Sequence, residues 1–274
     1  MTLLQSIFLG IIQGLTEFLP ISSSAHLVIT PYIMNWHIPA QEAFIFDVLV
    51  QLGTLLAVIV YFRKDLYLVI TSVFNGLIHK HPFEEASSRL GWILVLATIP
   101  AVIAGLLFKD PVERVFGSPL ATGLLLYGTA LLLVIAEFVG KRMRQIENIS
   151  WVDGLVVGLF QVISLLPGIS RSGSTISGGM IRNLERPAAA RFSFLMSIPV
   201  MLGAGSLAMF DLIKLPNFSV QIPTLIAGFI TSAVVGYLTI RWLLGYLVTQ
   251  RLFPFAIYCT VVSTSVILVS FIRS

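Results

Sequence analysis

Residues 13–26 read Gln-Gly-Leu-Thr-Glu-Phe-Leu-Pro-Ile-Ser-Ser-Ser-Ala-His, a polar segment inside an otherwise apolar region, which we call the first bend. Pro20 lacks a backbone donor and clashes with the preceding turn, so a helix that enters this segment is expected to break just before it. The three serines that follow can cap a second short helix that continues through His26. The free backbone N–H groups at such a helix start attract anions, phosphate in particular.

The composition is that of an integral membrane protein. Of the 274 residues, 57% are hydrophobic and only 11% are charged, whereas a soluble domain carries about 25% charged residues. Several apolar runs are about 20 residues long, which is the length that an α-helix needs to cross the hydrocarbon core. The ten-residue alternation of a membrane β-barrel is absent. We therefore predict an all-α polytopic membrane protein that forms a single domain over residues 1–274.

Charge and cysteine content exclude other classes of protein. The net charge of +4 is better explained by basic cytoplasmic loops than by binding to nucleic acid. Cys259 is the only cysteine, which excludes an internal disulfide bond and a cysteine metal cluster. The first residues lack the basic region and the cleavage site of a signal peptide.

Apolar runs and their interruptions predict the topology. Residues 1–30 and 150–180 are each broken by a proline, so we interpret them as two re-entrant pairs of half-helices. Residues 65–78 form a helix that is too short to cross the membrane. The six full spans are predicted at about 43–62, 90–108, 119–140, 187–209, 221–243 and 252–272.

Positive charges predict the orientation, because cytoplasmic loops of membrane proteins are enriched in Lys and Arg. If residues 141–144 are cytoplasmic, twelve Lys and Arg residues lie inside and four outside, and Arg171 completes the total of 17. This distribution places both termini on the extracytoplasmic side. If each re-entrant pair instead crossed the membrane twice, the loops that follow would lie on the same sides as before, so that alternative stays open.

A weak internal repeat relates the two ends of the chain. Residues 10–24 align without gaps to residues 158–172, at an offset of 148 residues. The halves, about 1–140 and 150–274, each contain one broken pair and three spans, so the second half is inserted upside down relative to the first. Broken helices of such inverted repeats meet near the membrane midplane and form binding sites. We therefore expect the first bend to face its counterpart, residues 161–175, which we call the second bend.

The second bend offers groups that suit an anionic ligand. Glycines let the backbone approach a ligand closely, and hydroxyls and amides donate to oxyanions. Arg171 supplies the planar, two-pronged donor that phosphate favours. The alternative for the serines and glycines is close helix packing in lipid. The candidate ligand-binding residues are Gly168, Ser170, Arg171, Ser172, Gly173 and Thr175.

The first bend carries a carboxylate at membrane depth. A charged carboxylate there costs roughly 2.5–3.5 kcal/mol, which makes Glu17 a functional candidate. Gln13 lies four residues earlier on the same helix face, and the pair can hold a divalent cation or orient water. The alternative is a structural ion pair between Glu17 and Arg171.

The first bend also carries hydroxyls beside a histidine. Ser22 and Ser23 precede His26 by four and three residues, so either hydroxyl can approach the imidazole on a helix. This spacing suggests a nucleophile and its base. The alternative is a histidine that is simply hydrogen-bonded within the core.

Together these motifs resemble one known family. The pattern Gln-x-x-x-Glu-Phe-Leu-Pro-x-Ser-Ser-x-x-His at 13–26 and the pattern Pro-Gly-x-Ser-Arg-Ser-Gly-x-Thr at 167–175 are similar to those of the undecaprenyl-diphosphate phosphatase family, the bacitracin-resistance membrane phosphatases of bacteria. Residues 46–53 and 254–258 extend the resemblance over essentially the full chain. The resemblance implies a multi-pass enzyme of the bacterial cytoplasmic (inner) membrane, with a site that is reached from the extracytoplasmic side.

The resemblance also implies the substrate, the cofactor and the partners. The enzyme would remove the terminal phosphate of undecaprenyl diphosphate and so recycle the lipid carrier of cell-wall synthesis, with bacitracin competing for the same lipid. A divalent cation, Mg²⁺ or Ca²⁺, would be held by Glu17 and Gln13. The family accepts Glu or Gln at the latter position, which leaves one carboxylate fewer for the metal. A homodimer is one alternative for the oligomeric state.

The expected mechanism is phosphoryl transfer by positioning and charge neutralisation. Ser23 attacks the terminal phosphorus, with Ser22 as the alternative nucleophile, and His26 takes the serine proton or later activates water. Arg171, with the hydroxyls and amides of the second bend, binds the phosphate oxygens, while Glu17 holds the cation or tunes His26. The rival hypothesis is a lipid-phosphate flippase or anion transporter, which the inverted repeat would also suit.

Overall fold

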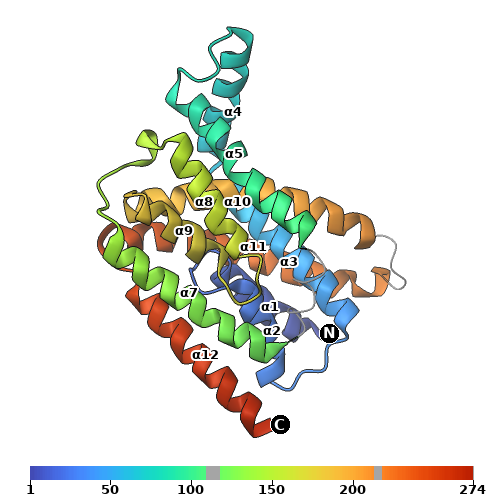
Figure 1. The fold of residues 1–274 in the computed structure, drawn as a ribbon. Coiled ribbons are helices and arrows are strands. Elements are labelled where there is room, and N and C mark those ends of the chain that lie inside the picture. The colour runs from blue at the N-terminus through green and yellow to red at the C-terminus, as the bar shows by residue number, and fades with distance from the viewer. Residues whose placement is uncertain (109–117, 213–217, 274) are drawn as a thin grey trace.

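The computed structural model describes residues 1–108, 118–212 and 218–273, and these ranges are almost entirely helical (Figure 1). Within them there is no β-strand, and the single β-bridge is an isolated contact between Arg144 and Leu184. The prediction of an all-α membrane protein is confirmed.

The helices are numbered as in Figure 1. They are α1 (Leu3–Thr16), α2 (Ser23–Ile33), α3 (Ala40–Tyr61), α4 (Arg63–Ile78), α5 (Ala86–Leu107), α7 (Pro119–Val139), α8 (Trp151–Ile163), α9 (Arg171–Ile181), α10 (Arg186–Leu212), α11 (Phe218–Thr249) and α12 (Phe253–Arg273), with a short 3-10 turn, η1 (Ile146–Asn148), before α8.

Five helices of the described ranges are long and apolar enough to cross a membrane: α3, α5, α7, α11 and α12. α10, with 27 residues, covers the remaining predicted span, at about 187–209. α1 and α8 are apolar but have only 14 and 13 residues, fewer than the roughly 20 that a span needs. These lengths suit the interpretation of residues 1–30 and 150–180 as broken pairs, and the number of crossings stays a prediction.

α1 lies directly on α11 because Gly14 leaves no side chain between the two helices. A Cβ atom at Gly14 would lie 2.7 Å from the Val235 Cβ atom and 2.9 Å from the Gly236 nitrogen. Such contacts are too close for any side chain, so the last turn of α1 is held against α11. The first bend leaves from that turn.

α9 lies deep inside the molecule. All residues from Ser172 to Met180 are buried, because α7, α8 and α10 pack around this helix. Thr129 of α7 anchors its start, since the Thr129 hydroxyl donates to the Gly168 carbonyl (3.0 Å) and accepts from the Ser170 backbone N–H (2.8 Å). The second bend is therefore fixed at its turn and along the helix that follows.

The far end of α9 is tied to α8 by a buried carboxylate. Asp153 accepts hydrogen bonds from Arg144 (2.7 Å) and Arg182 (2.8 Å), and from the Ser150 hydroxyl (2.7 Å). Burial alone would raise the pKa of the Asp153 carboxyl, but these hydrogen bonds hold that pKa low, at about 2. The carboxylate therefore stays charged and holds α8 and α9 together.

A second buried carboxylate joins α7, α10 and α12. Arg186 donates to both Glu137 oxygens at 2.7 and 2.6 Å, and Arg142 donates to one of them at 3.0 Å. The backbone N–H of Leu252 adds a fourth hydrogen bond at 2.8 Å. The four arginines of these two clusters are among the twelve Lys and Arg residues predicted to lie on the cytoplasmic side: Arg142, Arg144, Arg182 and Arg186.

The two chain ends lie at one end of the molecule (Figure 1). The Arg273 guanidinium donates to the Tyr32 carbonyl at 2.5 Å, at the end of α2. The N-terminal amine forms an ion pair with Glu42 at 2.7 Å, near the start of α3. Termini on the same side agree with the predicted topology, and which side that is stays a prediction.

Candidate active site

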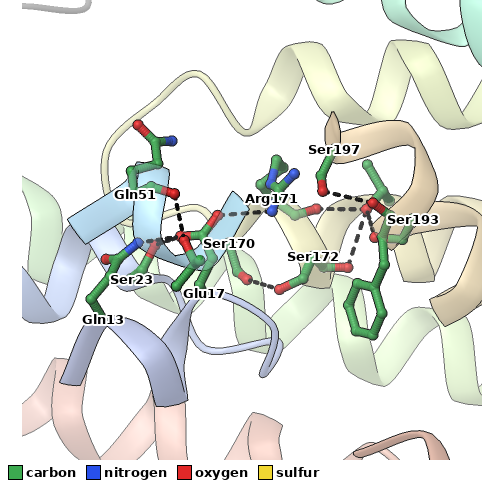
Figure 2. Close-up of polar contacts among 12 residues, drawn as sticks. Gln13, Glu17, Ser23, Gln51, Ser170, Arg171, Ser172, Ser193 and Ser197 are labelled. Atoms are coloured by element: carbon green, nitrogen blue, oxygen red, sulfur yellow. Dashed lines mark hydrogen bonds and ion pairs between the residues drawn. The ribbon is translucent and has the colours of Figure 1, made fainter. Parts of the chain in front are cut away.

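The two bends meet inside the molecule through residues such as Glu17 and Arg171, which are 154 positions apart in sequence (Figure 2). The Arg171 Nη2 donates to the Glu17 Oε1 at 2.8 Å. The Ser172 hydroxyl donates to the Leu19 carbonyl at 2.9 Å. The expectation that the bends face each other is met by these two contacts.

The first bend turns through a strained residue. Ser22 has φ 70° and ψ 100°, a conformation that non-glycine residues adopt only at a cost of about 1–3 kcal/mol. Its hydroxyl accepts from the Ala25 backbone N–H at 3.4 Å and so caps α2. With Ser22 used as the cap, the next residue, Ser23, is the first of α2 and its hydroxyl is not needed for capping.

Glu17 is the centre of the site. Its Oε2 accepts from the Ser23 hydroxyl at 2.6 Å and from the Gln13 Nε2 at 2.9 Å. Its Oε1 accepts from Arg171 at 2.8 Å. The carboxylate is only 6% exposed, and charge-assisted bonds of this length are strong. A hydroxyl that donates to a buried carboxylate has a route for losing its proton.

His26 is engaged elsewhere. Its Nδ1 lies 2.7 Å from the Ser22 backbone carbonyl, and its Nε2 lies 2.8 Å from the Tyr258 hydroxyl. The structure does not bring the imidazole to the hydroxyl of Ser22 or Ser23, as the helical spacing had suggested. The physical reason is that Ser22 caps α2 and that Ser23 turns to Glu17.

Two residues of the site were missed by the sequence analysis. Tyr258 reaches His26 from α12, 232 residues away, and the one available signal was its place in the motif at 254–258. Ser193 of α10 lies 2.6 Å from the Thr175 hydroxyl, which donates to the Arg171 carbonyl at 2.8 Å. No motif marked Ser193, whose role depends on the packing of α10 against α9.

The second bend turns through Gly168, whose φ of 104° is disfavoured for other residues. Ser170 then caps α9, since its hydroxyl accepts from the Gly173 backbone N–H at 3.0 Å. Figure 2 shows the side chains of Ser170 and Ser172 next to each other. Their hydroxyls lie 3.1 Å apart. The predicted ligand-binding hydroxyls thus have partners within the protein, and Arg171 and Ser172 are the residues of this bend that contact the first bend.

Two polar atoms beside Glu17 are buried without a partner in the part of the chain that the structure describes. They are the Nη1 of Arg171, a donor, and the Oε1 of Gln13, an acceptor. Buried polar groups without partners are rare, and each one calls for an explanation such as a bound ligand. The free donor of Arg171 suits an anionic oxygen, and the free acceptor of Gln13 suits a cation bound to that anion.

The protein alone offers few ligands for a metal. No group of three His, Cys, Asp or Glu side chains suited to a metal occurs within the described ranges. The Glu17 carboxylate already accepts from three donors, including a guanidinium, whereas the Gln13 Oε1 is a free oxygen. These residues fit a divalent cation only if the substrate phosphates supply further ligands, as is common for Mg²⁺.

Comparison with known proteins gives a consistent result over nearly the whole chain. Residues 6–265 match the family described as bacitracin resistance protein BacA. An undecaprenyl-diphosphatase of Chlorobium phaeovibrioides is 44% identical over 269 residues, which cover 94% of this chain and 93% of that protein. An undecaprenyl-diphosphatase of Moorella thermoacetica is 42% identical over 273 residues, which cover 100% of both chains.

Proposed function

The chain belongs to the family of the bacitracin resistance protein BacA, and we propose that it removes the terminal phosphate of undecaprenyl diphosphate with Ser23 as the nucleophile. It is a multi-pass membrane hydrolase whose products are undecaprenyl phosphate and phosphate. The reaction recycles the lipid carrier of cell-wall synthesis. The observation that carries the mechanism is the 2.6 Å hydrogen bond from the Ser23 hydroxyl to Glu17, which in turn pairs with Arg171.

In the first step, the Ser23 oxygen attacks the terminal phosphorus and passes its proton to the Glu17 Oε2. The bond from phosphorus to the bridging oxygen breaks, and undecaprenyl phosphate leaves. A protonated Glu17 attracts Arg171 less strongly, so the guanidinium becomes free to bind the transferred phosphoryl group. Geometry favours Glu17 over His26 as the serine base, because the Ser23 hydroxyl donates to Glu17, whereas the hydrogen-bond partners of the imidazole are Ser22 and Tyr258.

In the second step, water attacks the phosphoserine and phosphate is released. The Ser23 oxygen recovers the proton that Glu17 holds, and His26 accepts the proton of the water and releases it to solvent before the next turnover. An imidazole is the side chain most often used as a general base. Ser22 is the alternative nucleophile, but its strained backbone and capping hydroxyl make it a structural residue of the bend.

The second bend binds the phosphate. Arg171 offers its free Nη1 to one phosphate oxygen, and the start of α9 adds the partial positive charge of a helix N-terminus. The hydroxyls of Ser170, Ser172 and Thr175 and the backbone at Gly168 and Gly173 shape this end of the site. A bound divalent cation would neutralise phosphate charge, and the Gln13 Oε1 with a Glu17 oxygen would hold it.

We also propose where the reaction takes place. The excess of positive charge on the predicted cytoplasmic loops supports a site that opens to the extracytoplasmic side of the bacterial cytoplasmic membrane, with both termini on that side. Bacitracin would then compete for the same lipid diphosphate.

The decisive experiment measures phosphate release from a C55 polyprenyl diphosphate by the detergent-purified protein, with and without a chelator. We expect the wild type to release phosphate, the Ser23→Ala variant to release none, and the His26→Ala variant to release it much more slowly. A chelator should reduce the rate. A flippase or anion transporter would release no phosphate in detergent, so an inactive wild type would refute the proposal and favour transport.

A further inference from the structure

His26 and Tyr258 form a close pair between α2 and α12. The Tyr258 hydroxyl lies 2.8 Å from the imidazole Nε2, and the two rings stack at 11° with centroids 5.6 Å apart. On the opposite side of the ring, the Ser22 carbonyl lies 2.7 Å from Nδ1. His26 is 8% exposed and Tyr258 is 42% exposed. The imidazole is thus held on both nitrogens and on one face.

The two partners fix the tautomer of the neutral imidazole. A backbone carbonyl is only an acceptor, so Nδ1 must carry the hydrogen and donate it to Ser22. In the neutral ring Nε2 is then an acceptor, and the Tyr258 hydroxyl is its donor. When Nε2 gains a proton it becomes a donor, and the phenol oxygen can accept the hydrogen bond from it after rotation of the hydroxyl alone, since a hydroxyl both donates and accepts.

We propose that Tyr258 is a positioning residue for His26, which fixes the tautomer and the ring plane and satisfies Nε2 in both protonation states. The imidazole can therefore take and return a proton at Nε2 without moving. The inference rests on the proposed function in one respect, the participation of His26 in turnover.

Tyr258 is singled out by comparison with the other titratable groups near α2. α1, α7 and α12 pack against that helix. Glu17, at the end of α1, accepts a hydrogen bond from Ser23. On α7, Tyr127 forms a hydrogen bond with Thr264, and Glu137 accepts from two arginines. On α12, the Cys259 thiol faces the Pro20 carbonyl at 3.8 Å and Arg273 donates to the Tyr32 carbonyl. Tyr258 is the group of this set that bonds the imidazole.

The matched control is Tyr127. Its hydroxyl lies 2.8 Å from the Thr264 hydroxyl, so it also joins α12 to a neighbouring helix through a phenol hydrogen bond. Tyr127→Phe and Tyr258→Phe each remove one such bond and keep the ring. A purely structural role of the bond predicts similar effects for the two variants.

The test measures phosphate release from a C55 diphosphate as a function of pH for the wild type and both variants. We expect Tyr258→Phe to lower kcat about ten-fold, as is common for groups that orient a catalytic side chain, with KM within two-fold and a changed shape of the pH profile. Tyr127→Phe should keep the wild-type kcat and profile. A Tyr258→Phe enzyme with wild-type kcat, or with kcat lowered by the same factor at every pH, would overturn the proposal.

A second measurement needs no variant. In wild-type protein labelled with ¹⁵N-histidine, the His26 signals should report a hydrogen on Nδ1 and none on Nε2, and the opposite tautomer would refute the assignment. The two proposals fail separately. A wild type that releases no phosphate refutes the function, whereas an active wild type with an unaffected Tyr258→Phe variant refutes only the role of Tyr258.

Discussion

Residues 13–26 of the first bend and residues 161–174 of the second correspond position by position at an offset of 148 residues, and the two bends differ most in charge. Glu17 and Ser23 of the first stand where the second has Leu165 and Arg171. In the structure, the carboxylate accepts from both the hydroxyl and the guanidinium. Two segments of similar sequence thus supply unlike groups to one place, an acceptor with a nucleophile from one and a cation from the other.

The bends also differ in how the backbone turns. Ser22 of the first has φ 70°, whereas its counterpart Ser170 has an ordinary φ of −66°. The second bend instead places its positive φ on Gly168, which stands where the first has Pro20. Glycine adopts positive φ without a steric penalty. Backbone strain therefore lies in the bend that carries the proposed nucleophile.

Burial separates the helices that follow the two bends. Nine consecutive residues of α9, Ser172–Met180, are buried, whereas α2 buries only Ala25, His26 and Ile29. We infer that α9 holds Arg171 rigidly and that the first bend, which carries the proposed nucleophile, is the reacting side. Strain that persists at a site is often part of its function.

The largest effect expected from this difference is that of Ser23→Ala. Removal of the nucleophile should lower kcat by at least about 10³-fold, while binding of the lipid diphosphate persists because Arg171 and α9 are unchanged. Ser24→Ala is the matched control, since the Ser24 hydroxyl contacts only Ser22, at 3.3 Å, among the described residues. Near-normal phosphate release by Ser23→Ala would end the assignment of the first bend as the reacting side.

Arg171→Lys tests the second bend as a holder of the guanidinium. A point charge cannot replace the planar fork that binds Glu17 and a phosphate oxygen together, so we expect kcat/KM to fall by about 10²-fold. Arg182→Lys, at the other end of α9, is the control and should stay within a few-fold. Equal effects of the two variants would mean that arginine serves only to hold the helix in place.

Much of this arrangement was predictable from the sequence. Pro20 and Pro167 indicated the two breaks, and the inverted repeat indicated that the bends would face each other, with an ion pair between Glu17 and Arg171 as one alternative. The role of His26 was not predictable, because helical spacing reports which residues share a face and not which acceptor a side chain selects. Ser22 and Ser23 are neighbours, yet one caps α2 and the other bonds Glu17. Tyr258 and Ser193 depend on packing between distant helices; the motif at 254–258 was the one signal for Tyr258, and Ser193 had none.

If the second bend is rigid, Gly168→Ala should lower the stability of the protein. A Cβ atom there would clash with the Thr122 carbonyl and lie 2.9 Å from the Leu125 Cβ atom. Positive φ on alanine adds about 1–3 kcal/mol, and crowding costs a similar amount. Thermal unfolding in detergent should show a clear fall in Tm, while Gly105→Ala, which has nothing within 4 Å of its new Cβ atom, should not. A Gly168→Ala protein as stable as the wild type would show that the second bend adapts.

The smallest expected effect is a difference in Tm between glycine variants of the two serines that cap α2 and α9, Ser22 and Ser170. Ser22→Gly removes a strained φ, which is worth about 1 kcal/mol, and loses only a weak cap, since glycine caps almost as well as serine. Its Tm should therefore stay equal or rise, with phosphate release preserved. Ser170→Gly relieves no strain at φ −66° and makes the unfolded chain more flexible, so its Tm should fall slightly. If Ser22→Gly instead lost activity as completely as Ser23→Ala, Ser22 would be the nucleophile and the strained residue itself would do the chemistry.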